Sequence, residues 1–409
     1  MIKPEILAPA GNLEKLKTAI RFGADAVYLG GSKLNLRAFA DNFSNKELKE
    51  GIDYAHARGK KVYVTLNVFP HNEDLDGLEE YLKELYELGT DAIIVSDPGI
   101  IMTAREVVPN LEIHLSTQAN NVNYKSAIFW HKQGVKRVVL AREVSMEEIK
   151  TINDKTPESL DLEIFVHGSM CMSYSGRCLL SNYMTGRDSN RGACAQPCRY
   201  KYKLVEEKRS EESFPILEDE RGTYIMNSKD LCMIEYIPEL VKTGAVSLKI
   251  EGRMKSAYYV ATVVKAYREA LDAYISDPEG YKFNPKWLQQ LDKPSHRKYY
   301  TGFYLGDKDS QIYESSSYIR NYDIVGTVVS FDKENKVAVI EQRNKVFDNE
   351  TIEVLRPVGD NIEVTLADMK DENGNEIESA PSAQMLFQVK VDKDLEKDDI
   401  LIKAKEEKK

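Results

Sequence analysis

The sequence predicts an α/β protein: a (β/α)8 barrel of the TIM type, with a cysteine-rich insert after the seventh strand and a small C-terminal antiparallel β-barrel domain. In the first 255 residues, eight short apolar segments alternate with helical patterns, which is the order of elements that closes such a barrel. The spacing lengthens once, between the seventh and eighth segments, and all five cysteines lie in that gap. From about residue 322, short alternating strands separated by turn residues replace this pattern.

The eight segments are typical of buried parallel strands, because they are continuous apolar runs. They begin near Glu5, Ala26, Val62, Ala92, Glu112, Arg137, Leu162 and Ala245. Gly23 and Gly89 stand at helix ends, where glycine favours a left-handed cap, while Asn12 can begin the first helix and Ser145 with Glu148 forms a capping box. An open doubly wound sheet shares this local pattern, but eight is a number of strands at which a parallel barrel closes.

The chain therefore divides into a barrel over residues 1–275, a linker over 276–321 and a C-terminal domain over 322–405. The insert, residues 168–244, leaves the carboxyl end of the seventh strand. In a parallel barrel this is the face that carries the active site. The cysteines are thus expected beside the chemistry rather than at the structural end.

Charge and composition exclude some functions. A net charge of −10 argues against unspecific binding of a phosphate backbone over the whole surface, although a local basic face remains compatible with it. No apolar run reaches the roughly 18 residues that cross a bilayer. The first residues lack the basic segment and long apolar stretch of a signal peptide. We expect a cytoplasmic protein with no membrane contact.

Five cysteines are crowded between Cys171 and Cys232. An odd number without a secretion signal fits a disulfide framework poorly, whereas thiolates are common ligands of zinc and of iron–sulfur clusters. Zinc ribbons and fingers use cysteine pairs separated by two residues, and no such pair occurs here. The spacing therefore favours a cluster.

One long motif carries a resemblance. The segment from Glu163 to Ser181, ExFxxGSMCxxxxGxCxLS, is similar to the signature of the collagenase-like peptidase family U32. The opening LAPAG, the KIEGR at 249–253 and the YTGFY at 300–304 are similar to that family as well. Despite its name, the family includes RNA hydroxylases and partners in oxygen-independent quinone hydroxylation, several of which bind 4Fe-4S clusters.

The full two-domain length resembles the family's tRNA hydroxylation members. The resemblance implies 5-hydroxylation of the wobble uridine in the tRNA anticodon loop, a 4Fe-4S cluster as cofactor, and prephenate as co-substrate or ligand. A partner subunit or paralogue is compatible with it. The implied cluster ligands are Cys171, Cys178, Cys194 and Cys232, with Cys198 as the alternative to Cys232.

Two further groups of residues are candidates for binding. Between Tyr183 and Lys203, basic and aromatic residues interleave in a way that suits single-stranded RNA, although a solvated charged face gives the same pattern. The predicted RNA-binding residues are Arg187, Arg191, Arg199, Lys201, Lys203, Tyr200 and Tyr202. Arginines suit the two carboxylates of prephenate, and the predicted substrate-binding residues at strand ends are Arg142, Arg253, Lys249, Gln118 and Asn67, each of which could instead make an internal contact.

Catalysis is the least constrained prediction. His167 precedes the cysteine motif and is a weak candidate proton donor, although a structural histidine is the more ordinary interpretation. A peptidase that pairs His167 with Cys171 is an alternative, but no HExxH or GxSxG motif supports it and four thiols stay unexplained. A zinc-stabilised RNA-binding scaffold is a third hypothesis.

Overall fold

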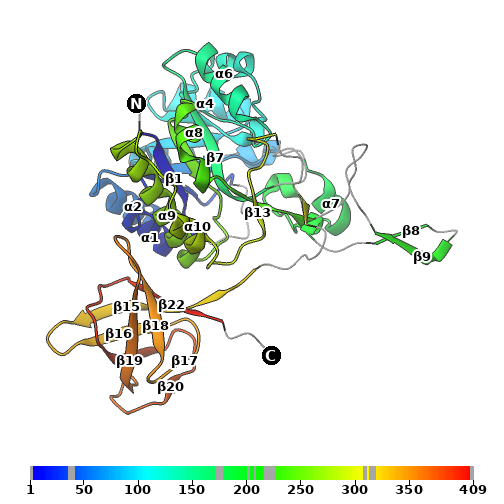
Figure 1. Cartoon of the computed structure of the whole chain (residues 1–409). Coiled ribbons are helices and arrows are strands. Elements are labelled where there is room, and N and C mark those ends of the chain that lie inside the picture. The colour runs from blue at the N-terminus through cyan, green and yellow to red at the C-terminus, as the bar shows by residue number, and fades with distance from the viewer. Residues whose placement is uncertain are drawn as a thin grey trace.

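The structure is a computed structural model. It describes residues 3–35, 42–170, 178–199, 203–206, 209–215, 227–306, 311–312 and 319–405. These residues form an α/β barrel that carries an insert on one side and a smaller β-barrel domain below it (Figure 1). No helix in this part of the chain combines the length and the hydropathy that crossing a membrane requires.

Eight parallel strands close the large barrel. The strands are β1 (Glu5–Pro9), β2 (Ala26–Gly30), β3 (Lys61–Leu66), β4 (Ala92–Val95), β5 (Glu112–Leu115), β6 (Arg137–Val139), β7 (Asp161–Ser169) and β12 (Ser247–Ile250). Each pairs with the next, and β12 pairs in parallel with both β7 and β1. The closed barrel is therefore confirmed, and the open doubly wound sheet is not formed.

Helices surround this barrel, and several begin and end at the predicted signals. They are α1 (Leu13–Arg21), α2 (Asn45–His56), α3 (Leu78–Leu88), α4 (Pro98–Val107), α5 (Tyr124–Lys132), α6 (Met146–Lys155), α8 (Ile237–Lys242) and α9 (Ala257–Ser276), with short 3-10 turns η1 (Asn72–Leu75), η2 (Thr117–Ala119) and η5 (Ile234–Tyr236). Asn12 accepts the Lys15 backbone N–H, the capping box of Ser145 and Glu148 is complete, and Gly89 is left-handed. These cap predictions are confirmed.

The insert begins where β7 extends beyond the strands of the barrel. Its described elements are α7 (Leu180–Thr185), η3 (Ser189–Arg191), η4 (Pro197–Arg199), β8 (Lys203–Glu206), β9 (Arg209–Pro215), β10 (Asn227–Ser228) and β11 (Asp230–Cys232). The last of these runs antiparallel to the end of β7, and β13 (Tyr299–Tyr300) pairs with β11, while β14 (Gln311–Ile312) pairs with β10. At the exit, Gly168 has a φ of +111°, and a Cβ there would lie 2.4 Å from the backbone oxygen of Glu251.

The C-terminal domain is a closed antiparallel barrel, as predicted. Its strands are β15 (Tyr322–Asp332), β16 (Val337–Gln342), β18 (Thr351–Leu355), β19 (Ile362–Lys370), β21 (Leu386–Val391) and β22 (Ile400–Ala404), with a side ladder of β17 (Val346–Phe347) and β20 (Ser379–Ala380). Leu355, Ile400 and Ile402 belong to the core of the large barrel, so the two domains share apolar packing.

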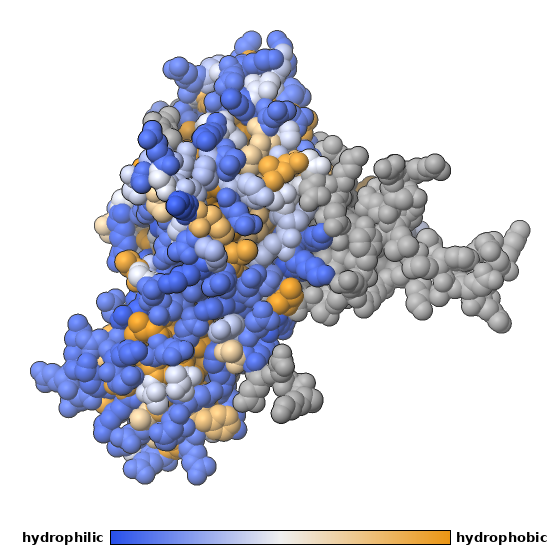
Figure 2. All heavy atoms as spheres, in the orientation of Figure 1, coloured by the Kyte–Doolittle hydropathy of each residue, from blue (hydrophilic) through white to orange (hydrophobic). Residues whose placement is uncertain are grey.

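A buried ion pair fastens the same junction. The Arg21 guanidinium of α1 lies 2.9 Å from the carboxylate of Asp399, whose side chain is fully buried. The linker helix α10 (Pro285–Leu291) packs against α9 nearby (Figure 1). The face seen in Figure 2 is mostly hydrophilic over both domains, with apolar residues in small patches. The C-terminal domain thus packs against the large barrel through apolar contacts and this ion pair.

Gly168→Ala should destabilise the barrel by about 2–4 kcal/mol, because the change adds a left-handed backbone penalty to a clash with Glu251. Gly59→Ala is the matched control: Gly59 also has a positive φ, but a Cβ there meets nothing within 4 Å. Urea unfolding followed by circular dichroism measures both. Equal losses for the two variants would contradict the role given to Gly168.

Candidate active site at the mouth of the barrel

The inner face of the barrel follows from strand alternation. Successive side chains of a strand point to opposite faces, so every second residue lines the interior. Tyr63 of β3 and Ile94 of β4 belong to the apolar cluster inside the barrel. Residues two or four positions further along the same strand point the same way. Thr65, Asn67 and Ser96 therefore also face the interior. We call the carboxyl ends of the eight strands the mouth.

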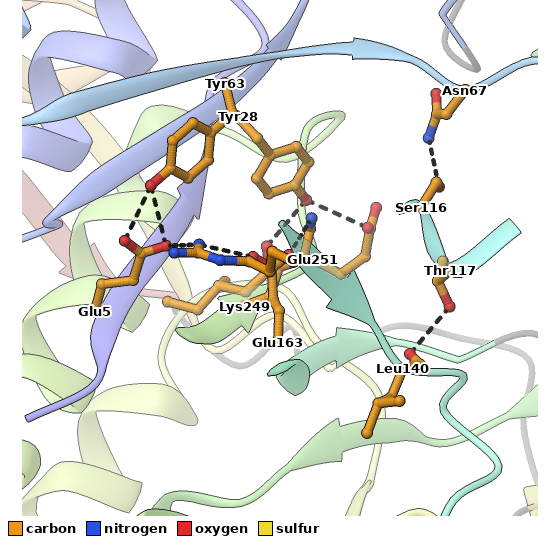
Figure 3. A network of polar contacts seen from close by, with 12 residues as sticks. Glu5, Tyr28, Tyr63, Asn67, Ser116, Thr117, Leu140, Glu163, Lys249 and Glu251 are labelled. Atoms are coloured by element: carbon orange, nitrogen blue, oxygen red, sulfur yellow. Dashed lines mark hydrogen bonds and ion pairs between the residues drawn. The ribbon is translucent and has the colours of Figure 1, made fainter. Parts of the chain in front are cut away.

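Below the mouth lies a buried network of charges, which we call the core ion network: Glu5, Arg137, Glu163 and Lys249 (Figure 3). Glu163 is fully buried and lies 2.7 Å from the Lys249 ammonium and 3.3 Å from the Arg137 guanidinium. Burial alone would raise the pKa of Glu163, but these two cations outweigh it and hold the pKa below its ordinary value. The carboxylate is therefore charged and fixes two strands, β6 and β12, from inside.

Two arginines reach the mouth above this network. Arg142 follows β6; its guanidinium lies 3.8 Å from the centre of the Phe165 ring and 3.6 Å from the Glu251 carboxylate. The Tyr28 hydroxyl donates to the same carboxylate over 3.3 Å. Arg142 is thus buried at the mouth and also makes the internal ion pair that the sequence left open as an alternative.

Arg253 follows β12 and is nearly buried as well. Its guanidinium donates to the Thr65 hydroxyl over 3.2 Å, and Thr65 donates in turn to the backbone oxygen of Leu29. Gly30 makes room for it, because a Cβ at that position would lie 2.7 Å from an Arg253 nitrogen. Lys249 lies deeper, 4.5 Å from the centre of the Tyr28 ring. Arg142 and Lys249 therefore lie on the β6 and β12 side of the barrel interior, while the Arg253 guanidinium extends from β12 to Thr65 of β3.

Asn67 and Gln118 occupy another side. The Asn67 side-chain amide donates to the Ser116 hydroxyl over 3.4 Å (Figure 3). The Gln118 backbone N–H donates to the same oxygen over 3.3 Å. Thr117 donates to the backbone oxygen of Leu140 and so ties the end of β5 to the end of β6. Sequence reasoning missed Glu163, Glu251 and Ser96, although their alternation with Phe165, Lys249 and Ile94 was a signal that could have found them.

The described thiols lie in the insert, the last of them in β11, where the chain comes back to the barrel. Cys178, Cys194 and Cys198 are half-buried, whereas Cys232 is buried in β11 directly opposite His167 of β7. The Gln196 N–H donates to the Cys194 sulfur over 3.4 Å, and Ala195 N–H donates to Ser181, which ties that turn to α7. Cys171 lies outside the described residues. Among those that are described, no three His, Cys, Asp or Glu side chains lie close enough to hold a metal ion.

Cys232 and His167 share a pocket of aromatic rings. The centres of the Tyr259, Tyr267 and Tyr299 rings lie between 5.3 and 6.0 Å from the His167 ring. Burial, aided by His296 and Lys255, lowers the pKa of His167 to about 3, and burial raises the pKa of the Cys232 thiol to about 12. His167 is therefore neutral and lies among these rings rather than among the mouth residues.

The predicted RNA-binding stretch is described only in part. Arg187 is exposed at the end of α7, and its Nε donates to the Ala193 backbone oxygen over 3.0 Å. Tyr183 on the same helix is 90% exposed. Arg191, Arg199 and Lys203 belong to η3, η4 and β8, whereas Tyr200, Lys201 and Tyr202 lie outside the described residues. The Phe69 N–H donates to the Asn190 backbone oxygen over 3.2 Å, so η3 contacts the loop after β3.

Comparison with known proteins gives two family matches. Residues 11–314 match the family described as peptidase family U32, and residues 320–401 match its C-terminal domain. The chain is 44% identical to tRNA hydroxylation protein P1 of Bacillus subtilis, over 98% of this chain and 95% of that protein. It is 38% identical to tRNA hydroxylation protein P of Escherichia coli, over 97% and 95%. A collagenase of Porphyromonas gingivalis is 35% identical over 74% of each chain.

Replacing Glu163 should destabilise the fold more than replacing one member of an exposed ion pair does. Glu163→Gln leaves Lys249 and Arg137 without their shared carboxylate, and we expect a loss of about 3 kcal/mol or more at pH 7. Glu50→Gln removes the exposed partner of Lys17 and should cost less than about 1 kcal/mol. Unfolding by urea measures both.

The difference in the free energy of unfolding between wild type and Glu163→Gln should also depend on pH. Because the folded-state pKa of Glu163 is depressed, its stabilisation is present above the ordinary value of 4.5 and is lost as the pH falls through the folded value. A gap that is unchanged at pH 3 would contradict a charged Glu163.

Proposed function

This chain belongs to peptidase family U32, and from that membership we propose that it acts in tRNA hydroxylation, by 5-hydroxylation of the wobble uridine with an iron–sulfur cluster and prephenate. The similarity to tRNA hydroxylation proteins over nearly the whole chain supports the reaction class. The observation that supports the location of the site is that the cysteine-rich insert leaves and rejoins the barrel at its mouth, where Arg142 and Arg253 are buried.

The kind of donor suits a 4Fe-4S cluster, whereas Cys178, Cys194 and Cys232, all of them described, are not gathered around one metal ion. Cys171, Cys178, Cys194 and Cys232 would hold it, with Cys198 as the alternative to Cys232. The fit rests on the donor set and on the Gln196 N–H, since hydrogen bonds of this kind to a ligating sulfur stabilise its thiolate and tune a cluster. When bound, such a cluster supplies one-electron chemistry or Lewis-acidic iron. The buried thiol of Cys232 would lose its proton on binding.

The arginine side of the mouth suits prephenate. A dicarboxylate needs planar donors held at fixed positions, and guanidinium groups provide them. Phe165 fixes the plane of Arg142 by stacking, and Thr65 fixes Arg253 by a hydrogen bond. Glu251 offers a negative charge on the same side, so it would turn a carboxylate towards the arginines and away from itself.

The insert suits the anticodon loop. Tyr183 on α7 is exposed enough to stack on an unpaired base, and Arg187, which follows the Gly186 cap of this helix, is exposed and can meet a phosphate. The contact of Asn190 with Phe69 keeps this surface at the rim of the mouth. A nucleotide held on the insert can therefore extend its base into the mouth of the barrel.

A peptidase is the second candidate, favoured by the collagenase among the similar proteins. Its base would be His167, which is neutral and could accept a proton from a cysteine thiol. The surrounding tyrosine rings leave its ring nitrogens without a hydrogen bond from any described residue. A zinc scaffold is the third candidate, and the metal content of the purified protein separates all three.

Anaerobically purified protein should contain about four iron and four sulfide ions per chain, as a cubane requires. Cys178→Ser and Cys194→Ser should lose most of both, and Cys232→Ser should lose more than Cys198→Ser. Iron and sulfide analysis measures the set, with near-native circular dichroism as the control for folding. Zinc without iron would support the scaffold, absence of iron and sulfide from the wild type would refute the cluster, and full iron in every variant would refute these cysteines as its ligands.

Arg253→Lys should lower 5-hydroxyuridine in tRNA at least tenfold, because a single ammonium cannot reproduce the fork of a guanidinium. Gly30→Ala should have a similar effect by displacing Arg253. Nucleoside mass spectrometry of tRNA from a complemented deletion strain measures the product. Arg58→Lys, in the exposed turn after α2, is the matched control and should leave the product unchanged.

A further inference from the structure

Three neighbouring strands end in polar side chains that line the interior. Asn67 follows β3, Ser96 follows β4 and Gln118 lies in η2 just after β5. Strand alternation directs Asn67 and Ser96 inwards, and the contact of Asn67 with Ser116 brings the ends of β3 and β5 together (Figure 3). We call Asn67, Ser96 and Gln118 the polar edge.

The polar edge carries oxygens without partners. The side-chain oxygens Asn67 Oδ1, Ser96 Oγ and Gln118 Oε1 are each buried and make no hydrogen bond with any described residue. A buried polar group without a partner is costly, and such groups are rare unless something else completes them. Three on adjacent strand ends indicate a ligand that completes them: the two amide oxygens need a hydrogen-bond donor, and the Ser96 hydroxyl can donate or accept.

The position of the polar edge relative to the cations limits what that ligand is. In the strand order of the closed barrel, β4 is four steps from β12 in either direction, so it lies opposite the strand that carries Lys249 and precedes Arg253. Lys249 stays on the β12 side, whereas the Arg253 guanidinium reaches Thr65 of β3 and so borders the polar edge. An anion is held by the cations, because oxygens that accept hydrogen bonds repel it. The β4 side instead offers neutral acceptors, which match a neutral group with an N–H donor.

We propose that the polar edge reads the base of the target uridine and distinguishes uracil from cytosine. This inference rests on the proposed function and adds to it the residues that select the base. Asn67 is turned by its bond to Ser116 so that its oxygen is left to accept. The amide oxygens of Asn67 and Gln118 accept from the N3–H of uracil, and the Ser96 hydroxyl meets a ring carbonyl.

The selectivity follows from the difference between the two bases. Uracil carries a proton on N3, whereas cytosine carries a lone pair there. An acceptor aimed at N3 therefore pairs with uracil and faces a second lone pair in cytosine. Sites that are built to hydrogen-bond one group reject an analogue that lacks it, because the buried polar atoms are then left unpaired. Enzymes that modify bases commonly read the extruded base along this edge.

The test uses two fluorescent anticodon stem-loop RNAs that differ only in U or C at the wobble position, bound to the full-length iron-loaded protein and followed by anisotropy. Wild type should bind the U loop at least tenfold more tightly than the C loop. Gln118→Ala and Asn67→Ala should lose most of this preference while keeping the affinity for the C loop. Asn110→Ala, on the opposite end of β5, is the matched control and should keep the preference.

The outcomes separate the inference from the proposed function. Retention of the preference in both variants, or equal binding of the two loops by wild type, would overturn the base-reading role while leaving a tRNA-binding protein. Equal weakening of both loops would show a merely structural role and would overturn it too. If wild type binds neither loop, the tRNA assignment itself fails, and the inference falls with it.

Discussion

The parallel pairing of β12 with both β1 and β7 is the constraint on which the rest of the structure depends. It places the carboxyl end of β12 beside the point where the chain leaves β7, since Ile250 lies opposite His167, and β11 of the insert returns against the same end of β7. The insert therefore stands at the mouth. The Glu251 N–H donates to the His167 backbone oxygen across this junction, and Gly168 lets the two backbones meet. Glu163 holds the same strands from inside through Lys249 and Arg137. The same strands, β7 and β12, therefore close the barrel, carry the buried ion pair and fix the position of the insert.

Much of this arrangement could be predicted from the sequence because it is local. The eight apolar runs, the caps at Asn12 and Ser145, and the presence of Arg142 and Arg253 at strand ends depend on residues close together in the chain. The partners of those arginines could not be predicted. Arg142 meets Glu251, and Arg253 meets Thr65, across more than a hundred residues of sequence, and only the register of the closed barrel brings them together.

The mouth combines two kinds of chemistry. Arg142 and Lys249 lie on the β6 and β12 side, Arg253 extends from β12 to Thr65 of β3, and neutral acceptors lie at the ends of β3, β4 and β5. A site of this kind can hold an anionic co-substrate and a neutral base together without placing either against a like group. The overall charge of −10 is compatible with RNA binding at a local basic surface, such as the one that Arg187 offers on the insert.

The most direct test of this account is the 5-hydroxyuridine content of tRNA from a bacterial strain in which this chain is the only tRNA hydroxylation protein. We expect the wobble uridine to carry the 5-hydroxyl group when the chain is expressed, and to lose it when prephenate synthesis is blocked. Unmodified wobble uridine in cells that contain folded, iron-loaded protein and normal prephenate would contradict the account.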